Sequence, residues 1–386
     1  KRGLVLLTEF KNIKKILIIK LRHIGDVLLT IPAIRAAKET FPDTSITALV
    51  NSGTEDMLEG ISLVDEIFVL DRSMFRQSLL DRIKYEIYFV KKLRAGHFDM
   101  AIDFTGGDRP ALYSFLSGAR YRIGYADCGG FAGKRFLYTH RFKIDRGRHT
   151  VLQNLELLNK AGMHTNNLSI EFHTHKEDEE WLNNTLREKG IKQGDMFVHI
   201  HPTSRWLFKC WQDEAMASLI DRIQEQYCVK VVMTCSPDKR EMNKASRIIA
   251  LTRKEPVAFI GDISLKKLAA ISKRAKLFFG VDSAPMHIAA AVNTPVVALF
   301  GPSGAFHWGP WENDYSQESG VRSQESKEIP YQKRNGVQTF GKHTVIQRDW
   351  DCVPCGKDGC NGSKVSDCLY DIEVGEVMKT IERYLR

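Results

Sequence analysis

The stretch that decides the fold is LFFGVDSAPMHIAAAVNTPVVALFGP, which occupies residues 277–302. Its first five residues and residues 296–300 are short apolar runs, typical of strands that are buried on both faces of a parallel sheet. Between them lies a segment rich in small residues, with Pro285 in its first turn, which predicts a short helix packed closely on the sheet. The stretch therefore predicts a strand–turn–helix–strand unit that ends at Gly301 and Pro302.

The turn between this first strand and the helix has a chemical consequence. A helix N-terminus at the carboxyl edge of a parallel sheet presents free N–H groups and a partial positive charge, which suit a phosphate or diphosphate. Asp282 and Ser283 precede the helix, and both are good N-cap residues. The alternative is that these two side chains only cap a structural helix.

The same alternation of apolar runs and helical patterns extends along the chain in both directions. Alternating strands and helices predict parallel, doubly wound sheets of the α/β class. Apolar runs that predict strands lie at residues 16–19, 45–50, 66–70, 100–104, 196–200, 229–234 and 257–260, besides the two strands above. Among the helices, one is expected over about 27–40 and a long amphipathic one over about 75–94. The apolar stripe of the second helix consists of Leu79, Ile83, Ile87 and Val90.

The chain of 386 residues is long enough for two domains of ordinary size. Residues 11–165 are predicted to form one Rossmann-like domain and residues 195–370 a second, with a linker and helix over 166–194 and a final helix over 371–386. Ligands of open α/β sheets bind at the carboxyl ends of the strands. A cleft between the two domains is therefore the expected place for the site.

Composition narrows the choice of compartment and partner. The chain is 43% hydrophobic and 27% charged, as in ordinary globular proteins. It has no apolar run long enough to span a membrane, and residues 1–8 do not look like a signal peptide, which favours the cytoplasm. The net charge of +9 favours an anionic partner: a nucleic acid, an anionic membrane surface or a phosphorylated substrate. No nucleic-acid-binding motif is visible, so no nucleic acid is expected.

Two further turns carry groups suited to catalysis. Gly25 and Asp26 follow the first strand, and a carboxylate there is placed to take a proton from a hydroxyl nucleophile, unless it is only a helix N-cap. The loop after the strand at 196–200 carries two hydroxyls and two cations, which suit a diphosphate leaving group, unless the loop is merely basic and exposed. Its polar residues include Thr203, Ser204 and Lys209.

A third turn, over residues 234–241, also follows a strand. An acidic residue at this place holds ribose hydroxyls in other nucleotide-binding folds. Asp238 and Glu241 both qualify, and the alternative is again the capped start of a helix. No G-x-G-x-x-G follows the first strand and no P-loop motif occurs, which argues against a dinucleotide oxidoreductase and a P-loop NTPase.

Two other groups of residues are candidates for binding. Between residues 118 and 149 the helix–strand pattern loosens and basic residues gather, either as a solvated face or as a surface for a phosphorylated or membrane-embedded acceptor. The acceptor-binding candidates there are Arg120, Arg122, Arg141 and Lys143. A cluster of thiols near the C-terminus is a possible structural zinc site, with free thiols or disulfides as alternatives. Its members are Cys352, Cys355, Cys360 and Cys368.

Three motifs together resemble the ADP-heptose:lipopolysaccharide heptosyltransferases, which form glycosyltransferase family 9. They are LRHIGDVLL at residues 21–29, PTSRWLFKCW at 202–211 and GVDSAPMH at 280–287. The likeness runs from about Ile13 to Phe306 and resumes weakly in the final helix. The FKCW sequence within the middle motif is similar to the heptosyltransferase III branch of the family. The segment at about 313–342 and the cysteine cluster depart from the family pattern.

This resemblance implies the GT-B fold, in which two Rossmann-like domains face each other across a cleft and the C-terminal one holds the nucleotide. It implies inverting, metal-independent transfer of heptose from ADP-heptose to a heptose of the lipopolysaccharide inner core, with no cofactor. It also implies a lipid A–core oligosaccharide acceptor and a cytoplasmic enzyme peripheral on the inner face of the inner membrane, against its anionic surface. Two alternatives stay open: a GT-B enzyme for another nucleotide sugar, and a non-catalytic nucleotide- or nucleic-acid-binding protein.

The resemblance also implies roles for individual residues. Asp26 would be the general base for the acceptor hydroxyl, and Lys209 would contact the phosphates of the donor. Asp282 would meet the heptose, and the turn that follows it would bind the diphosphate. The full set of implied donor-binding residues is Gly25, Thr203, Ser204, Lys209, Asp238, Glu241, Asp282, Ser283, Ala284, Pro285, Met286 and His287.

Overall fold

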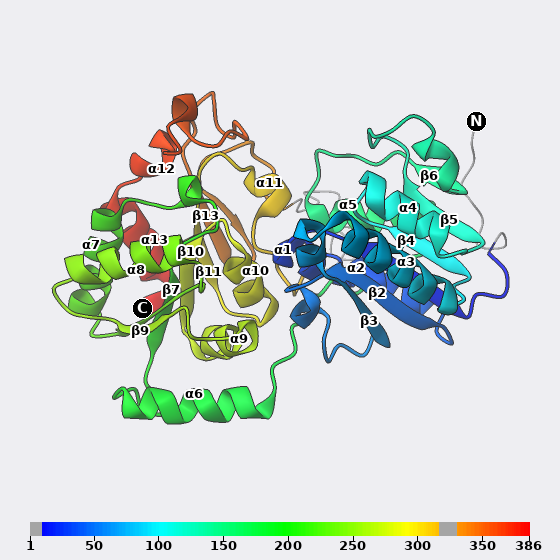
Figure 1. The fold of residues 1–386 in the computed structure, drawn as a ribbon. Helices are drawn as coiled ribbons and strands as arrows, with labels where there is room; N and C mark the ends of the chain where they lie inside the picture. Colours follow the sequence, from blue (N-terminus) through cyan, green and yellow to red (C-terminus); the bar gives the residue numbers. More distant parts are fainter. Residues whose placement is uncertain (1–9, 316–329) are drawn as a thin grey trace. The chain divides into compact units, whose positions relative to one another are not determined.

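The computed structural model describes residues 10–315 and 330–386. It divides into two compact units, the first ending at His173 and the second beginning at Thr174 (Figure 1). Each unit is a twisted, mainly parallel sheet with helices on both faces, as in Rossmann-like folds. The α/β class predicted from the sequence is therefore confirmed.

Within the described residues, the first unit contains a six-stranded parallel sheet in the order β3-β2-β1-β4-β5-β6. Its strands are β1 (Lys15–Lys20), β2 (Ser45–Asn51), β3 (Glu66–Leu70), β4 (Met100–Asp103), β5 (Tyr121–Tyr125) and β6 (His140–Phe142). The strand order reverses between β1 and β4. The carboxyl ends of these two strands are thus the switch point of the sheet, where ligands bind in open α/β folds.

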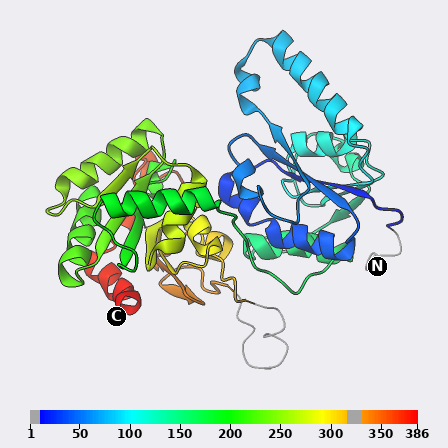
Figure 2. The same cartoon turned by 90° about the horizontal axis from the view of Figure 1, so that it is seen from below.

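Helices cover both faces of this sheet (Figure 2). On one face α2 (Ile31–Thr40) packs with α5 (Thr150–Lys160), and on the other α3 (Leu79–Ala95) packs with α4 (Asp108–Leu116). Shorter elements complete the unit: α1 (Ile24–Leu28), η2 (Glu55–Met57), η3 (Arg72–Arg76) and η4 (Lys134–Leu137).

Three sequence predictions for the first unit are wrong in detail. The helix expected over 27–40 is broken into α1 and α2, because Pro32 in the first turn of α2 has no N–H to continue the ladder. The segment 118–149 is more regular than expected, since it contains β5 and β6. The strand β6 has only three residues, which is too short to stand out as an apolar run.

The third wrong prediction concerns the side of α3 that faces the core. The predicted stripe is exposed: Leu79, Ile83 and Ile87 retain 68%, 47% and 52% of their accessible surface. The buried residues of α3 are instead Phe89 and Leu93. Most of this amphipathic helix therefore turns its apolar residues toward solvent.

In the described part of the second unit, seven strands form one sheet in the order β12-β13-β11-β10-β7-β8-β9. All neighbours are parallel except β12 and β13. The strands are β7 (Phe197–His201), β8 (Lys230–Cys235), β9 (Val257–Ile260), β10 (Leu277–Val281), β11 (Val296–Phe300), β12 (Gln338–Phe340) and β13 (His343–Gln347). The last two lie beyond the stretch that the sequence pattern interpreted, and part of the polar segment before them falls outside the described residues.

Two groups of helices cover this sheet. On one face α7 (Asp213–Gln226) packs against α8 (Lys239–Leu251) and α13 (Val374–Leu385). On the other, α9 (Leu265–Arg274) packs against α6 (Lys176–Glu188) and α10 (Ala284–Ala291). The short elements are η5 (Leu207–Lys209), α11 (Ala305–Trp308), η7 (Cys360–Gly362) and α12 (Asp367–Tyr370). The helix that the sequence assigns to a linker, α6, thus packs as part of the second unit.

Candidate active site

The switch point of the second sheet lies between β7 and β10, where Gly280 stands opposite His201. A Cβ atom on Gly280 would lie 2.9 Å from the carbonyl oxygen of His201, closer than real Cβ atoms approach. Glycine is therefore needed for the two strands to run this close together. The loops that leave β7 and β10 start side by side at the edge where nucleotides bind in such folds.

These two loops bring Lys209 and Asp282 together. Lys209 ends η5 in the loop after β7, and Asp282 directly follows β10. The Nζ atom of Lys209 donates to Oδ2 of Asp282 at 2.6 Å, and the Asp282 side chain is largely buried. Each residue was singled out in the sequence for the donor, but their contact was not predicted.

The N-terminus of α10 has no side-chain cap. Ser283 occupies the N-cap position, but its hydroxyl donates to the carbonyl oxygen of Val281 at 3.2 Å instead of accepting from the helix. The Asp282 carboxylate accepts from Lys209. The interpretation that these two side chains only cap a helix is therefore wrong. At this turn Pro285 has no N–H, and the N–H of Met286 donates to the carbonyl oxygen of Ser283 at 3.2 Å. The N–H of Ala284 and the positive end of the helix are left to suit an anion.

The loop after β7 is anchored from behind. Trp211 is fully buried and donates its indole N–H to the carbonyl oxygen of Ile372 at 3.1 Å. The hydroxyl of Ser366 donates to the carbonyl oxygen of Phe208 at 2.6 Å. Burial raises the pKa of Cys210 to about 12, so its thiol is neutral. Cys210 and Trp211 of the FKCW sequence thus pack into the unit and hold Lys209 at the edge of the sheet.

A buried polar chain that the sequence analysis missed supports Thr203. The hydroxyl of Thr234 lies 2.8 Å from both Nε2 of His199 and Nδ1 of His201. His199 also contacts the hydroxyl of Ser272 at 2.9 Å, and Thr203 lies 3.5 Å from Nε2 of His201. Two histidines spaced by two residues in an otherwise apolar strand share one face of the sheet. That spacing was the available signal.

The histidines make stability depend on pH. Burial lowers the pKa of His201 to about 3, and burial also lowers the pKa of His199 well below its ordinary value. A histidine whose pKa is lower in the folded than in the unfolded protein binds fewer protons when folded. The free energy of unfolding therefore falls as the pH drops below about 6.5, by up to about 1.4 kcal/mol per pH unit for each histidine.

Urea unfolding of the second unit at pH 7 and pH 5 measures this loss. The variant His201→Asn is expected to lose less stability between the two pH values than the unmodified protein does. A suitable control is His97→Asn, because His97 is exposed in the first unit at φ 50°, a conformation that asparagine tolerates. Equal pH dependence in all three proteins contradicts the prediction.

The third loop distinguishes its two acidic candidates. Asp238 is the N-cap of α8 and accepts from the backbone N–H of Arg240 at 2.9 Å. Its hydrogen bond with the Arg240 side chain lowers the pKa of this carboxyl. The helix-cap interpretation is thus confirmed for Asp238. Glu241 is buried in the first turn of α8, and its carboxylate makes no hydrogen bond or ion pair with any residue that the structure describes.

In the first unit, Asp26 lies half-buried in the first turn of α1, after the carboxyl end of β1. His23 is the N-cap residue, so the helix-cap interpretation of Asp26 is wrong. Within residues 10–315 and 330–386, its carboxylate has no hydrogen-bond or ion-pair partner. Lys20 at the end of β1 is buried and donates to the carbonyl oxygen of Phe104 at 3.0 Å. Burial lowers the pKa of Lys20, and the negative charge of Asp26 opposes that effect.

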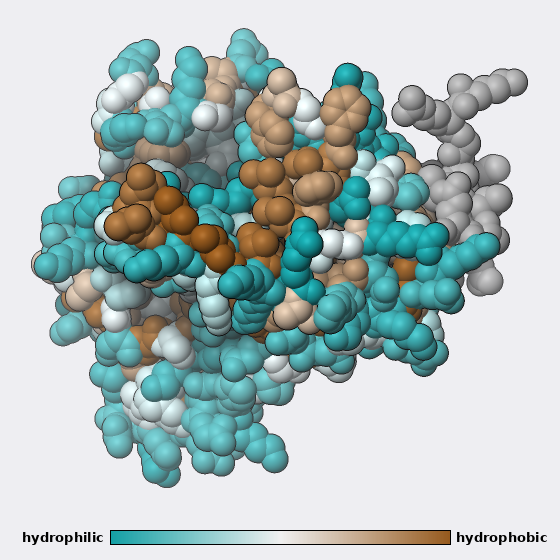
Figure 3. Space-filling model, turned by 45° about the vertical axis from the view of Figure 1, so that its right-hand side comes forward, coloured by the Kyte–Doolittle hydropathy of each residue, from teal (hydrophilic) through white to brown (hydrophobic). Residues whose placement is uncertain are grey.

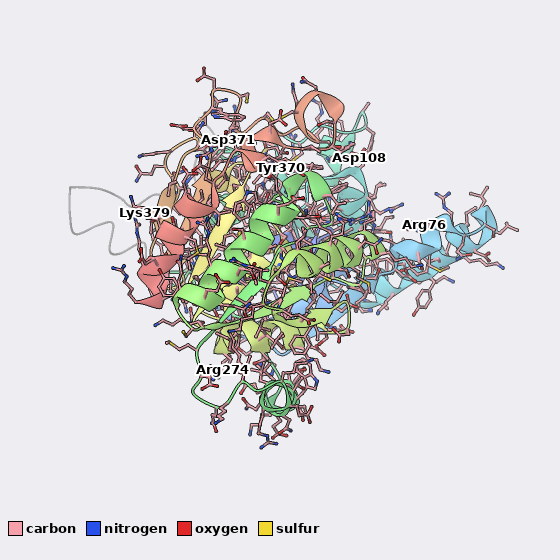
Figure 4. The ribbon with its side chains drawn as sticks, turned by 90° about the vertical axis from the view of Figure 1, so that its left-hand side faces the viewer. Arg76, Asp108, Arg274, Tyr370, Asp371 and Lys379 are labelled. Carbon is pink, nitrogen blue, oxygen red and sulfur yellow. The ribbon has the colours of Figure 1, made fainter. Side chains whose placement is uncertain are left out.

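A polar pocket of about 390 Å³ opens at the same edge of this sheet. Arg22, Arg72 and Arg109 line it, together with Asp108 at the start of α4, which Figure 4 labels. Three guanidinium groups against one carboxylate make the pocket suitable for an anion. It lies at the carboxyl ends of β1 to β4, beside the turn that carries Asp26.

None of the four acceptor-binding candidates from the sequence lines this pocket. Arg122 donates to the carbonyl oxygens of Leu137 and Ala119 at 2.6 and 2.7 Å, and therefore supports the local backbone. Arg120 lies 5.0 Å from the ring centre of Tyr121, at the amino end of β5. Arg141 and Lys143 are exposed on and after the edge strand β6.

The cysteine-rich segment has reduced thiols in this structure. Cys368 is buried near the other three, and burial followed by their charges raises its pKa to about 11. In the described ranges, no group of three or more His, Cys, Asp or Glu side chains is arranged to hold a metal ion. The thiols are thus neighbours but not a formed ligand set. Among the described helices, none is long and apolar enough to cross a membrane.

The fold of two Rossmann-like units is that of the GT-B class. A glycosyltransferase family 9 protein from Veillonella parvula has the same fold, with a TM-score of 0.76, 20% identity and coverage of 99% of this chain and 98% of that one. The Escherichia coli heptosyltransferase WaaC, solved with ADP-2-deoxy-2-fluoro heptose, aligns with a TM-score of 0.65 at 17% identity, covering 96% of this chain and 99% of that one.

The sequence defines the family. The model of glycosyltransferase family 9 (heptosyltransferase) matches residues 87–338, more than half of the chain. Lipopolysaccharide heptosyltransferase 3 of E. coli strain K12 is 32% identical over 304 residues, which cover 77% of this chain and 85% of that protein. The chain belongs to glycosyltransferase family 9, the heptosyltransferases, as the resemblance of its three motifs indicated.

Proposed function

We propose that the protein transfers heptose from ADP-heptose to a heptose of the lipopolysaccharide inner core. The observation that carries this proposal is the 32% identity to a lipopolysaccharide heptosyltransferase 3 over most of both chains. The shared fold of a heptosyltransferase solved with an ADP-heptose analogue supports the choice of donor. Membership of an enzyme family leaves no role for the non-catalytic alternative.

The second unit binds the donor in this proposal. The diphosphate lies at the N-terminus of α10, where the N–H of Ala284 and the positive end of the helix face its oxygens, and the Lys209 ammonium offsets the charge that develops as ADP leaves. Thr203 and Ser204 add hydroxyl donors. Glu241 holds the ribose hydroxyls, because its carboxylate is not engaged with any described residue whereas Asp238 caps a helix. Asp282 contacts the heptose.

The first unit binds the acceptor and supplies the base. The Asp26 carboxylate takes the proton of the acceptor hydroxyl as its oxygen attacks the anomeric carbon and the bond to the diphosphate breaks. Such a direct displacement inverts the configuration at the anomeric carbon, which the coupling of the anomeric proton in the product reports. The pocket lined by Arg22, Arg72 and Arg109 takes an anionic group of the lipid A–core acceptor.

We further propose that neither donor binding nor transfer needs a metal ion, with the protein acting on the cytoplasmic face of the membrane. Lys209 and the α10 N-terminus supply the positive charge that a divalent cation supplies elsewhere. An Asp-x-Asp pair, of the kind that can hold a divalent metal on a sugar nucleotide, occurs at Asp349 and Asp351. The exposed position of both residues after β13 gives no support for a metal bound with the donor. Transfer that continues in excess EDTA supports this reading.

Thermal unfolding with a panel of ligands tests the donor. ADP and ADP-heptose are expected to stabilise the protein, by about 2.7 kcal/mol at 100 times the dissociation constant, with and without EDTA. UDP, GDP and NAD are expected to give no shift at the same concentration. Stabilisation by UDP or GDP alone would keep the fold and overturn the heptose assignment. A requirement for added Mg²⁺ would overturn metal independence.

A further inference from the structure

The helix α3 carries exposed apolar side chains that the proposed catalytic site does not use. Five large apolar side chains of this helix lie mostly in solvent, with 47% to 70% of their surface accessible. They form the α3 apolar face, which consists of Leu79, Leu80, Ile83, Ile87 and Tyr88. Figure 3 shows apolar atoms gathered on the side of the molecule that it brings forward, bordered by hydrophilic ones. Contiguous apolar surface of this kind marks an interaction site.

The fold of the first unit does not require these side chains. The C-terminal half of α3 is held by the buried residues Phe89 and Leu93. Its N-terminal half is held through Tyr85, whose hydroxyl accepts from the backbone N–H of Asp71 at 2.8 Å and whose ring stacks on Phe89. The apolar face is therefore additional to the packing of the helix.

A groove runs along the same helix. It has a volume of about 390 Å³ and lies between η3 and the first half of α3. Met74, Tyr85 and Tyr88 line it together with the polar residues Gln77, Asp81 and Lys84. The α3 apolar face thus continues into a depression that can take part of an apolar chain.

The charge around this face is positive. Between residues 72 and 94 the sequence has seven cationic and two acidic side chains, a net charge of +5. One acid, Glu86, is engaged by the hydroxyl of Tyr113 at 2.9 Å. The cations are Arg72, Arg76, Arg82, Lys84, Lys91, Lys92 and Arg94, of which Figure 4 labels Arg76.

This combination decides between the possible occupants. A second copy of the chain would bring two such cationic helices together, and like charges disfavour that contact. An apolar face flanked by cations is what lies stably in the boundary between headgroups and acyl chains of an anionic membrane. We propose that α3 docks the first unit on an anionic membrane surface, with the α3 apolar face inserted and the flanking cations on lipid phosphates.

The docking surface adjoins the arginine-lined pocket. Arg72 lines that pocket and also begins the cationic segment that leads into α3. Docking would hold the pocket near the lipid surface that carries the acceptor. This last step rests on the proposed function, whereas docking itself does not, because it needs neither donor nor acceptor.

Cosedimentation with lipid vesicles tests the proposal. Vesicles of phosphatidylethanolamine and phosphatidylglycerol are expected to bind the protein, more weakly at high salt, and phosphatidylcholine vesicles to bind it at least about tenfold less. The double variants Leu80→Ser/Ile83→Ser and Lys84→Glu/Lys91→Glu are each expected to lose at least about tenfold in affinity. Matched controls in the second unit are Leu251→Ser, with an exposed leucine on α8, and Lys379→Glu, with an exposed lysine on α13.

The outcomes separate the proposal from its rivals. The α3 variants should keep their thermal stability and their transfer to a water-soluble acceptor fragment without lipid, because none of these residues belongs to the proposed site. Equal binding by the α3 variants and the controls overturns the proposal. So does a dimer in sedimentation equilibrium that Leu80→Ser/Ile83→Ser converts to a monomer, because the face would then bind a second copy.

Discussion

Replacing Asp26 by asparagine is expected to lower the rate of heptose transfer roughly 10²- to 10⁴-fold and to leave ADP binding unchanged. The substitution keeps the shape of the side chain but removes the oxygen that accepts a proton. Asp26 is half-buried in α1 and does not cap its helix, and its carboxylate makes no hydrogen bond or ion pair with a described residue. Its loss should therefore cost activity and not stability.

Initial rates with saturating donor and a core-oligosaccharide acceptor measure the loss, and thermal unfolding with ADP measures retained donor binding. Asp43→Asn is the matched control, because Asp43 is an exposed aspartate in a turn of the same unit. Turnover at the rate of the unmodified protein would remove Asp26 from the mechanism. Loss of both transfer and ADP stabilisation would instead point to a structural fault.

Much of the fold was predictable because buried parallel strands are continuous apolar runs. The strands β3, β9, β10 and β11 begin and end where the sequence pattern predicted. The short edge strand β6 did not stand out, because an edge needs fewer apolar residues. The facing of α3 could not be predicted either, since amphipathicity shows that a helix has an apolar side but not what covers it. On α3 the core uses Phe89 and Leu93 and leaves the stripe outside.

The site was predictable motif by motif, but its contacts were not. The ion pair of Lys209 with Asp282 joins residues 73 positions apart. It depends on the pairing of β7 with β10, and the order of the strands along the chain does not predict that pairing. The roles of Asp238 and Glu241 were likewise open in the sequence, because capping and ligand binding favour the same residue types after a strand.

The two partners of this ion pair are expected to respond in opposite directions. Lys209→Gln should weaken ADP binding roughly 10- to 100-fold, because a charge-assisted hydrogen bond to the diphosphate is lost, and should lower transfer roughly 10²- to 10³-fold. Asp282→Asn should instead tighten ADP binding. It releases the Lys209 ammonium from its 2.6 Å contact and removes a negative charge from the edge that receives the diphosphate.

Transfer should nevertheless fall in Asp282→Asn, because the proposed contact with the heptose is weakened. Calorimetric titration of ADP into both variants and their double mutant decides the matter, with Asp314→Asn, an exposed aspartate of the second unit, as the control. If the ion pair is purely structural, both single variants should lose stability equally and keep an unchanged affinity for ADP. If ADP affinity falls in Lys209→Gln and rises in Asp282→Asn, Lys209 exchanges its carboxylate partner for the diphosphate when the donor binds.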